Sequence, residues 1–323
     1  MAPLKAALLT LIISLSLNAC GGQTLLRIAV VNPSRGHGAK IIESFVTELE
    51  TRLPAEAYVV DYPGLLPRRG DTEEFLTSLM EEKPDIVLAI TQYALDAVIS
   101  AEIHAETPVL AWSMDDLQAK QIAREPLRPD KNITGVITGV TATPAEELRL
   151  AWLKKLAPGR RTIWTPYNPG DIDLIQGLGS FMFTAADLEL EPLLQPVRSV
   201  EDAQASLEAM PRDIEAVFLF GDRNIGAVRH DYYQECIRRK IPCSGPNSNS
   251  VREGALFSYS FIESSVGARL AAMAAQILRG TPVEEIPFET PDFGLAINLA
   301  TAEKIGLEIT ETHLMQASLL VRD

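Results

Sequence analysis

The sequence predicts an α/β protein built from two lobes of parallel β-sheet with flanking helices. Short apolar runs alternate with amphipathic stretches along the chain, as in parallel sheets with crossover helices. The alternation restarts near residue 143, which divides the chain into two halves of similar size. Glycines and prolines stand at the ends of elements rather than in one linker, which favours lobes joined by chain segments that cross between them.

The first half opens with a buried-strand pattern at Leu26–Val31, which breaks in the turn-forming segment 32–38. Apolar residues then recur at helical spacing from Ile41 to Leu49. The remaining expected elements are strands at Ala57–Tyr62, Asp85–Ile90, Pro108–Trp112 and Ile133–Ile137, and helices at Thr72–Glu82 and Tyr93–Ser100.

The second half opens with an expected helix that ends near Leu156. Thr143 is its predicted N-cap, with Pro144 at the first helical position and Glu146 completing a capping box. The remaining expected elements are strands at Arg161–Pro166, Leu188–Gln195, Ala216–Phe220, Ile241–Ser244, Ala255–Phe261 and Phe293–Asn298, and helices at Asn224–Lys240, Ser264–Leu278 and Ala300–Ile305.

The first twenty residues have the pattern of a targeting signal. Lys5 precedes the apolar run Ala6–Leu17, which is about half the length that spans a bilayer. The run ends in Leu17-Asn18-Ala19-Cys20, which resembles a bacterial lipobox, although Asn18 departs from the small or apolar residue usual there. We expect residues 1–19 to be a signal peptide, Cys20 to be lipidated and residues 20–25 to form a tether; an ordinary cleaved signal is the alternative.

Composition and motifs exclude several classes of protein. The net charge of −14 over 323 residues disfavours nucleic-acid binding, because the phosphate backbone is also negative. The four histidines are scattered, so no metal site is expected. No nucleophile elbow occurs, and no Gly-x-Gly-x-x-Gly follows the first strand, so we expect neither an enzyme nor a cofactor.

Two further cysteines, Cys236 and Cys243, fall on an expected helix and on the strand after it. A disulfide between them depends on the separation of their Cα atoms. The sequence leaves open a disulfide or two buried free thiols.

A series of short motifs spans residues 84–306: Pro84-Asp85-Ile86-Val87 with Thr91 and Ala94, Asn132–Val136, Tyr167-Asn168-Pro169, Asp222, Ile241-Pro242, Arg252–Ala255, Ala274–Pro282 and Ile297–Ala302. In order and spacing they resemble the substrate-binding components of ABC transporters, in the family that includes tryptophan- and tyrosine-type amino-acid binders. The resemblance implies a type-1 periplasmic-binding fold, in which two Rossmann-like lobes joined by three hinge crossings close over a ligand.

On this basis we assign residues 26–140 plus 259–287 to lobe one and residues 141–258 plus 288–323 to lobe two. Open parallel sheets bind ligands beyond the carboxyl ends of their strands, so the loops after the strands of both lobes would line one cleft. The expected ligand-binding residues are Asn32, Ser34, Arg35, Thr91, Gln92, Tyr93, Ser113, Asp115, Tyr167, Asn168, Asp222, Asn224, Asn247 and Tyr259.

In the family, the positions that match Thr91, Asp115 and Asp222 belong to ligand-side loops. An aspartate there would pair with an amino group, and the hydroxyl of Thr91 with a carboxylate. Asp222 is equally interpretable as a helix N-cap. Family members usually have a His-Pro pair after the first strand, where this chain has Asn32-Pro33. Arg35, which follows it, is interpretable as an anion-binding group or as a solvated side chain.

The run Phe181-Met182-Phe183 replaces polar residues of the family. It is interpretable as core packing, or as an apolar surface for a lipid-like ligand or a partner.

Together with the lipobox-like segment, the resemblance implies a lipid-anchored periplasmic protein that captures a small molecule for an ABC permease and acts as a monomer. The ligand would be an amino acid or an aromatic or apolar molecule. Two alternatives remain open: a ligand sensor that partners a membrane signalling protein, and a carrier of a sterol- or lipid-like molecule.

Overall fold

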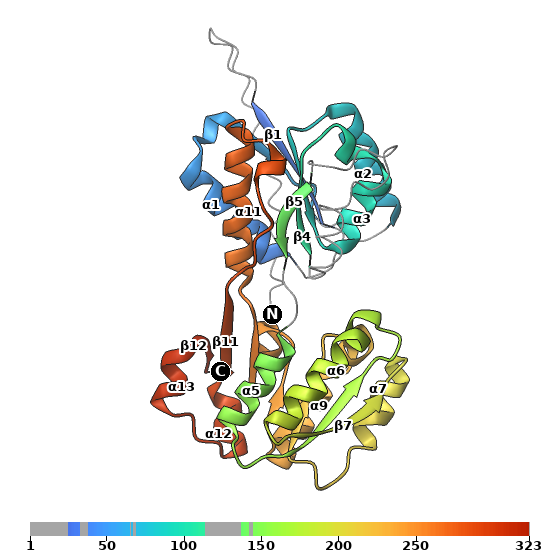
Figure 1. Ribbon diagram of the computed structural model, residues 1–323, viewed down its shortest axis with the longest axis vertical. Helices are drawn as coiled ribbons and strands as arrows, with labels where there is room; N and C mark the ends of the chain where they lie inside the picture. The colour runs from blue at the N-terminus through green and yellow to red at the C-terminus, as the bar shows by residue number, and fades with distance from the viewer. Residues whose placement is uncertain are drawn as a thin grey trace, which may run out of the picture.

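The computed structural model describes residues 25–32, 38–64, 66, 69–113, 137–141 and 145–322. They form two α/β lobes, which Figure 1 shows one above the other. The predicted signal peptide and Cys20, and the candidate residues Ser34, Arg35 and Asp115, lie outside the described residues.

In lobe one the described strands are all parallel, in the order β2-β1-β3-β4-β5. Their bounds are β1 Leu26–Val31, β2 Tyr58–Asp61, β3 Ile86–Ile90, β4 Val109–Ser113 and β5 Ile137–Thr141. The helices are α1 (Ala39–Arg52), α2 (Arg69–Glu82), α3 (Gln92–Ser100) and α11 (Glu263–Leu278), and the short 3-10 helices are Ala55–Ala57, Ile103–Ala105 and Val283–Glu285.

Helices cover both faces of this sheet, and the alternation of side chains along β1 separates the two halves of the core. Ile28 and Val30 pack toward α1 and α11, whereas Ala29 and Val31 pack toward α2 and α3. Figure 1 shows α11 beside α1, although more than 200 residues separate them in the chain. Gly267 permits this contact, since a Cβ there would lie 2.3 Å from the carbonyl oxygen of Ile41.

In lobe two the described strands follow the order β12-β11-β10-β9-β8-β6-β7 and are parallel except for the antiparallel pair β10 and β11. Their bounds are β6 Thr162–Tyr167, β7 Glu191–Pro196, β8 Ala216–Phe218, β9 Cys243–Ser244, β10 Phe257–Phe261, β11 Phe293–Asn298 and β12 Ala317–Val321. The helices are α5 Glu146–Leu156, α6 Ile172–Asp187, α7 Val200–Glu208, α8 Arg223–Ala227, α9 Arg229–Arg239, α10 Ser248–Arg252, α12 Leu299–Ile305 and α13 Glu311–Gln316.

The chain passes between the lobes after β5, after β10 and before β11. The residue at which we divided the lobes, Tyr259, lies inside β10, and β10 pairs along its whole length with β11 in the second sheet. The second crossing therefore follows Phe261 rather than residue 258. The third crossing is held to lobe one, because Arg269 of α11 contacts both Glu289 and Asp292 at 2.8 Å.

Several elements differ from the sequence-based expectation. The fifth strand, expected to end at Ile137, continues to Thr141; residues 133–136 of the expected strand lie outside the described part. The helix expected at Asn224–Lys240 is divided at Val228 into α8 and α9. The segment 172–187, in which two glycines weaken helical propensity, nevertheless forms the helix α6 because its apolar side packs on the second sheet.

The run Phe181-Met182-Phe183 on α6 divides between core and surface, so core packing accounts for Phe181 alone. Phe181 is buried against Phe218 and Phe220, whereas Phe183 is 68% exposed and Met182 is also exposed. Successive helical residues point about 100° apart, so three apolar residues in a row cannot all face one core.

Cys236 and Cys243 are buried free thiols, so the disulfide that the sequence left open is not formed. No helix among the described residues is long and apolar enough to cross a membrane.

Candidate functional site

The carboxyl ends of the first sheet's strands, and of β6 to β10 in the second sheet, point toward the other lobe, whereas β11 and β12 run the opposite way. β5 ends at Thr141 and the next described helix, α5, begins at Glu146 in lobe two; the other strands of the first sheet are parallel to β5. Conversely, β10 ends at Phe261, α11 begins at Glu263 in lobe one, and β6 to β9 are parallel to β10. The loops that follow the strands of both lobes therefore stand at two facing edges, where open α/β sheets bind ligands.

In lobe one, Asn32 directly follows β1 and is fully buried. Its main-chain oxygen accepts a hydrogen bond from the backbone N–H of Leu66. Gly38, at the start of α1, has a φ of 88°, and a Cβ there would lie 2.6 Å from Ile90 and 3.3 Å from the Asn32 amide nitrogen. The glycine is therefore required both by the left-handed backbone and by the space beside Asn32.

Thr91, which follows β3, has a backbone conformation that is almost confined to glycine. Its φ is 111° and its ψ is 156°, and its hydroxyl accepts a hydrogen bond from the backbone N–H of Ala94 at 3.3 Å. Strained residues of this kind cluster at functional sites. Its neighbours Gln92 and Tyr93 open α3; Gln92 donates to Asp96, and the Tyr93 side chain is 49% exposed.

In lobe two, Asp222 is the N-cap of α8, as one of its two interpretations predicted. Its Oδ1 accepts hydrogen bonds from the backbone N–H groups of Asn224 and Ile225 at 2.7 and 3.0 Å. Its Oδ2 accepts from the side-chain amide of Asn168 at 2.9 Å, which ties the loop after β6 to the start of α8. Asn224 in turn donates to the carbonyl oxygen of Arg198. Three predicted site residues therefore form one hydrogen-bonded cluster at the inward edge of lobe two.

The remaining predicted residues lie around this edge with different partners. Asn247 caps α10 by accepting from the backbone N–H and the hydroxyl of Ser250. Tyr167, the last residue of β6, packs on the lobe-two core, and Tyr259 stacks between Trp152 and Phe293 near the second crossing. Ser113 is the last residue of β4 and pairs with Thr141 in the first sheet.

Arg149, on α5, was not among the predicted residues. It is 2% exposed, and burial lowers the pKa of its guanidinium. Burial also raises the pKa of Glu146, one turn earlier, whose Oε1 lies 3.6 Å from Arg149 Nη2. The sequence does contain a signal: Arg149 occupies the same helical face as the buried Leu153 and Leu156, where an arginine is unusual.

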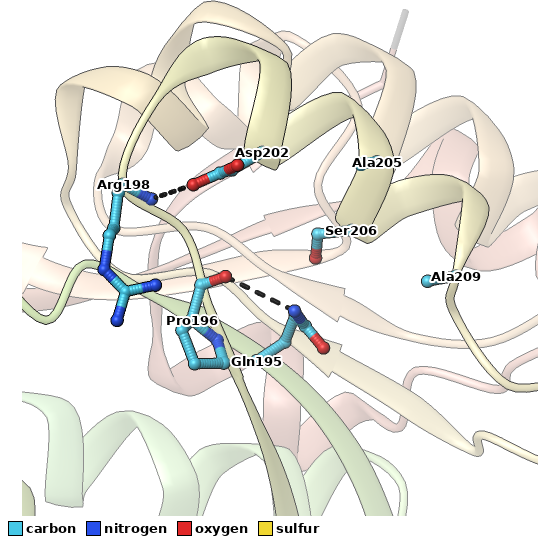
Figure 2. Close-up of a pocket in the computed structure, with 7 residues that line it drawn as sticks. All are labelled: Gln195, Pro196, Arg198, Asp202, Ala205, Ser206 and Ala209. Carbon is cyan, nitrogen blue, oxygen red and sulfur yellow. Dashed lines mark hydrogen bonds between the residues drawn. The ribbon is translucent and has the colours of Figure 1, made fainter.

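A separate hollow of about 360 Å³ lies on lobe two between the end of β7 and α7. Figure 2 shows that its two drawn hydrogen bonds are local, from the Arg198 backbone to Asp202 and from Gln195 to the Pro196 carbonyl oxygen. None of the predicted ligand-binding residues lines it. Within the described ranges, no group of three or more histidine, cysteine, aspartate or glutamate side chains is placed to hold a metal ion.

Residues 67–321 match the family model of the ABC transporter substrate binding proteins. Among curated relatives, an uncharacterized protein of Rickettsia prowazekii is 24% identical over 70% of this chain and 73% of its own length. A tyrosine-binding protein of Clostridioides difficile is 20% identical over 72% of this chain and 66% of its own length.

Solved structures show the same fold at low identity. A Streptococcus pneumoniae ABC domain in complex with L-Trp has a TM-score of 0.72 at 19% identity, covering 92% of this chain and 100% of that one. A ligand-free, open substrate-binding protein with adhesive properties from Clostridium difficile has a TM-score of 0.75 at 18% identity, covering 93% and 100%.

Proposed function

Since the chain belongs to the family of ABC transporter substrate-binding proteins, we propose that it captures a small molecule between its two lobes and delivers it to an ABC permease. The observation that carries this proposal is the facing of the two strand edges. A ligand that contacts both edges would favour the closed arrangement, because it gains interactions there that the open arrangement lacks.

The proposed contacts come from both lobes. In lobe one they are the buried Asn32 and the strained Thr91, with Gln92, Tyr93 and Ser113 beside them. In lobe two the cluster of Asn168, Asp222 and Asn224 supplies polar groups, and Tyr167, Asn247 and Tyr259 border it. The relatives named as tyrosine-binding and as bound to L-Trp support an aromatic amino acid as the first ligand to test.

The protein is proposed to act outside the cytoplasmic membrane, held there through acyl chains on Cys20. The support is the apolar run that ends at the cysteine in a lipobox-like sequence. Cys20→Ser would move the protein from the membrane fraction to the soluble envelope fraction, as measured by immunoblotting of the separated fractions. Retention of the variant on the membrane would contradict the anchor and leave the binding proposal intact.

The binding proposal is tested by native mass spectrometry of the full chain purified from its own membranes, followed by thermal unfolding with the released molecule. We expect a bound small molecule that raises the unfolding temperature with concentration by mass action. Crosslinking in membranes should then recover a permease. If no molecule co-purifies, and tyrosine and tryptophan leave the unfolding temperature unchanged, the proposed function is wrong.

A further inference from the structure

The guanidinium of Arg149 is buried without the hydrogen bonds that such a group requires. Within the described part of the chain, neither Nη1 nor Nη2 has a hydrogen-bond partner. The Oε1 atom of Glu146 stands 3.6 Å from Nη2, which is beyond hydrogen-bond distance. A guanidinium stays charged at every physiological pH, and its burial without partners costs free energy that packing alone does not return. An acceptor for these N–H groups must therefore come from outside the described residues.

Aromatic side chains hold this guanidinium in place from one side. Its central carbon lies 4.0 Å from the centroid of the Phe218 ring, and Phe218 is itself packed against Phe181 and Phe220. A ring beneath a guanidinium stabilises the charge but leaves the in-plane N–H groups without acceptors. Ser244 is the register partner of Phe218 on the next strand, so it projects from the same face of the sheet. Its hydroxyl is also buried, with no hydrogen-bond partner among the residues that the structure describes.

These groups stand at the edge of lobe two that faces lobe one. Phe218 is the last residue of β8 and Ser244 is the last residue of β9. Arg149 lies in the first turns of α5, directly after the first crossing. Glu146 is one turn nearer the crossing, and its side chain is 19% exposed. A ligand that approaches from between the lobes therefore reaches Glu146 first and Arg149 behind it.

We propose that Arg149 recognises a single carboxylate on the ligand, which takes the place of the Glu146 carboxylate and accepts hydrogen bonds from both Nη atoms. This inference rests on the proposed function and adds a chemical class to its ligand. The two ends of a guanidinium match the two oxygens of a carboxylate, and the Ser244 hydroxyl supplies another donor from the same face. Glu146 and the nearby Asp171 add negative charge, which disfavours a dianion such as phosphate at this position.

The test compares carboxylic acids with their primary amides, which have nearly the same shape and no charge. The probes are L-tyrosine, L-tryptophan and palmitate, each beside its amide, titrated calorimetrically into the purified full-length protein. We expect the wild-type chain to prefer an acid, and Arg149→Gln to weaken that acid by about 10- to 100-fold while changing the amide by less than about threefold. Arg149→Lys keeps the charge but not the paired nitrogens, so its affinity for the acid should lie between those of the wild type and Arg149→Gln.

Matched variants separate recognition from folding. Arg212→Gln makes the same change at an exposed arginine in the turn between α7 and β8 and should leave the affinity for the acid unchanged. Glu146→Gln removes the competing charge and should strengthen acid binding. Without ligand, the unfolding temperature of Arg149→Gln should equal or exceed that of the wild type, because the substitution removes a buried charge that has no hydrogen-bonded partner among the described residues.

The inference fails if folded Arg149→Gln keeps the wild-type preference for the acid, or if the molecule that co-purifies with the protein has no carboxylate. In either case the proposed capture function would stand. If the wild-type chain bound none of the six probes and carried no co-purified molecule, the proposed function would fail together with the inference.

Discussion

Thr91 provides a direct test of stored backbone strain at the inward edge of lobe one. Its φ of 111° with ψ of 156° lies in a region where side chains other than hydrogen are disfavoured, at a cost of about 1–3 kcal/mol. Glycine at this position relieves the strain and alanine does not. We therefore expect Thr91→Gly to be more stable than Thr91→Ala, although glycine ordinarily costs about 0.5–1 kcal/mol relative to alanine within regular structure.

The N-cap role of Thr91 complicates this comparison, because glycine is also a better N-cap than alanine. Thr310 is the matched control: it caps α13 through the backbone N–H of His313, with an ordinary φ of −73°. At each position we take the difference in free energy of unfolding between the Gly and the Ala variant. Subtracting the difference at Thr310 from the difference at Thr91 cancels the cap preference and the flexibility of glycine. The remainder is the strain at Thr91, and we expect it to be about 1–3 kcal/mol.

The assay is equilibrium unfolding in urea of the four variants, with the slope of the transition checked against the wild type. A remainder near zero would refute the strained conformation at Thr91. If the strain serves ligand binding, Thr91→Gly should also bind the ligand more weakly than the wild type while being no less stable than Thr91→Ala.

Further predictions concern helix packing, pH, the thiols and the cap of α8. Gly267→Ala should destabilise lobe one by about 1–3 kcal/mol in urea unfolding, since its Cβ would meet the backbone of α1; an unchanged midpoint would contradict the close approach of α1 and α11. Hydrogen bonds from Arg238 lower the pKa of Glu235 to about 2, so its contribution to stability is present above about pH 4.5 and is lost as the pH falls toward 2. Glu235→Gln should therefore have a lower urea midpoint of unfolding than the wild type at pH 7 and the same midpoint near pH 2. A difference in midpoint that does not change with pH would contradict the lowered pKa of Glu235. Cys236 and Cys243 should react with a thiol reagent only on unfolding, and a reducing agent should leave the unfolding temperature unchanged; a fall in that temperature would indicate a disulfide. Asp222→Ala should cost about 1 kcal/mol through loss of the cap, whereas Asp222→Asn should keep the fold, so weaker binding by the Asn variant would identify contact with a cationic group of the ligand.

Most strands and several helices could be predicted from the sequence because both repeat periods are local, whereas α6, α7, α10, α13 and β12 were not among the expected elements. Alternation along Leu26–Val31 and helical spacing from Ile41 to Leu49 need no knowledge of what lies across the core. The N-cap role of Asp222 is also local, since the backbone N–H groups that donate to its carboxylate lie within three residues. The candidate residues at strand ends followed from the general rule for parallel sheets rather than from any single motif.

The tertiary structure alone decided the features that depend on distant segments. The position of α11 on α1 requires contact between segments more than 200 residues apart, and the second crossing after Phe261 is set by pairing with β11. The burial of Arg149 over Phe218 depends on three elements meeting at one edge. A side chain's identity and spacing specify its chemistry, but its desolvation and the acceptors within its reach are properties of everything folded around it.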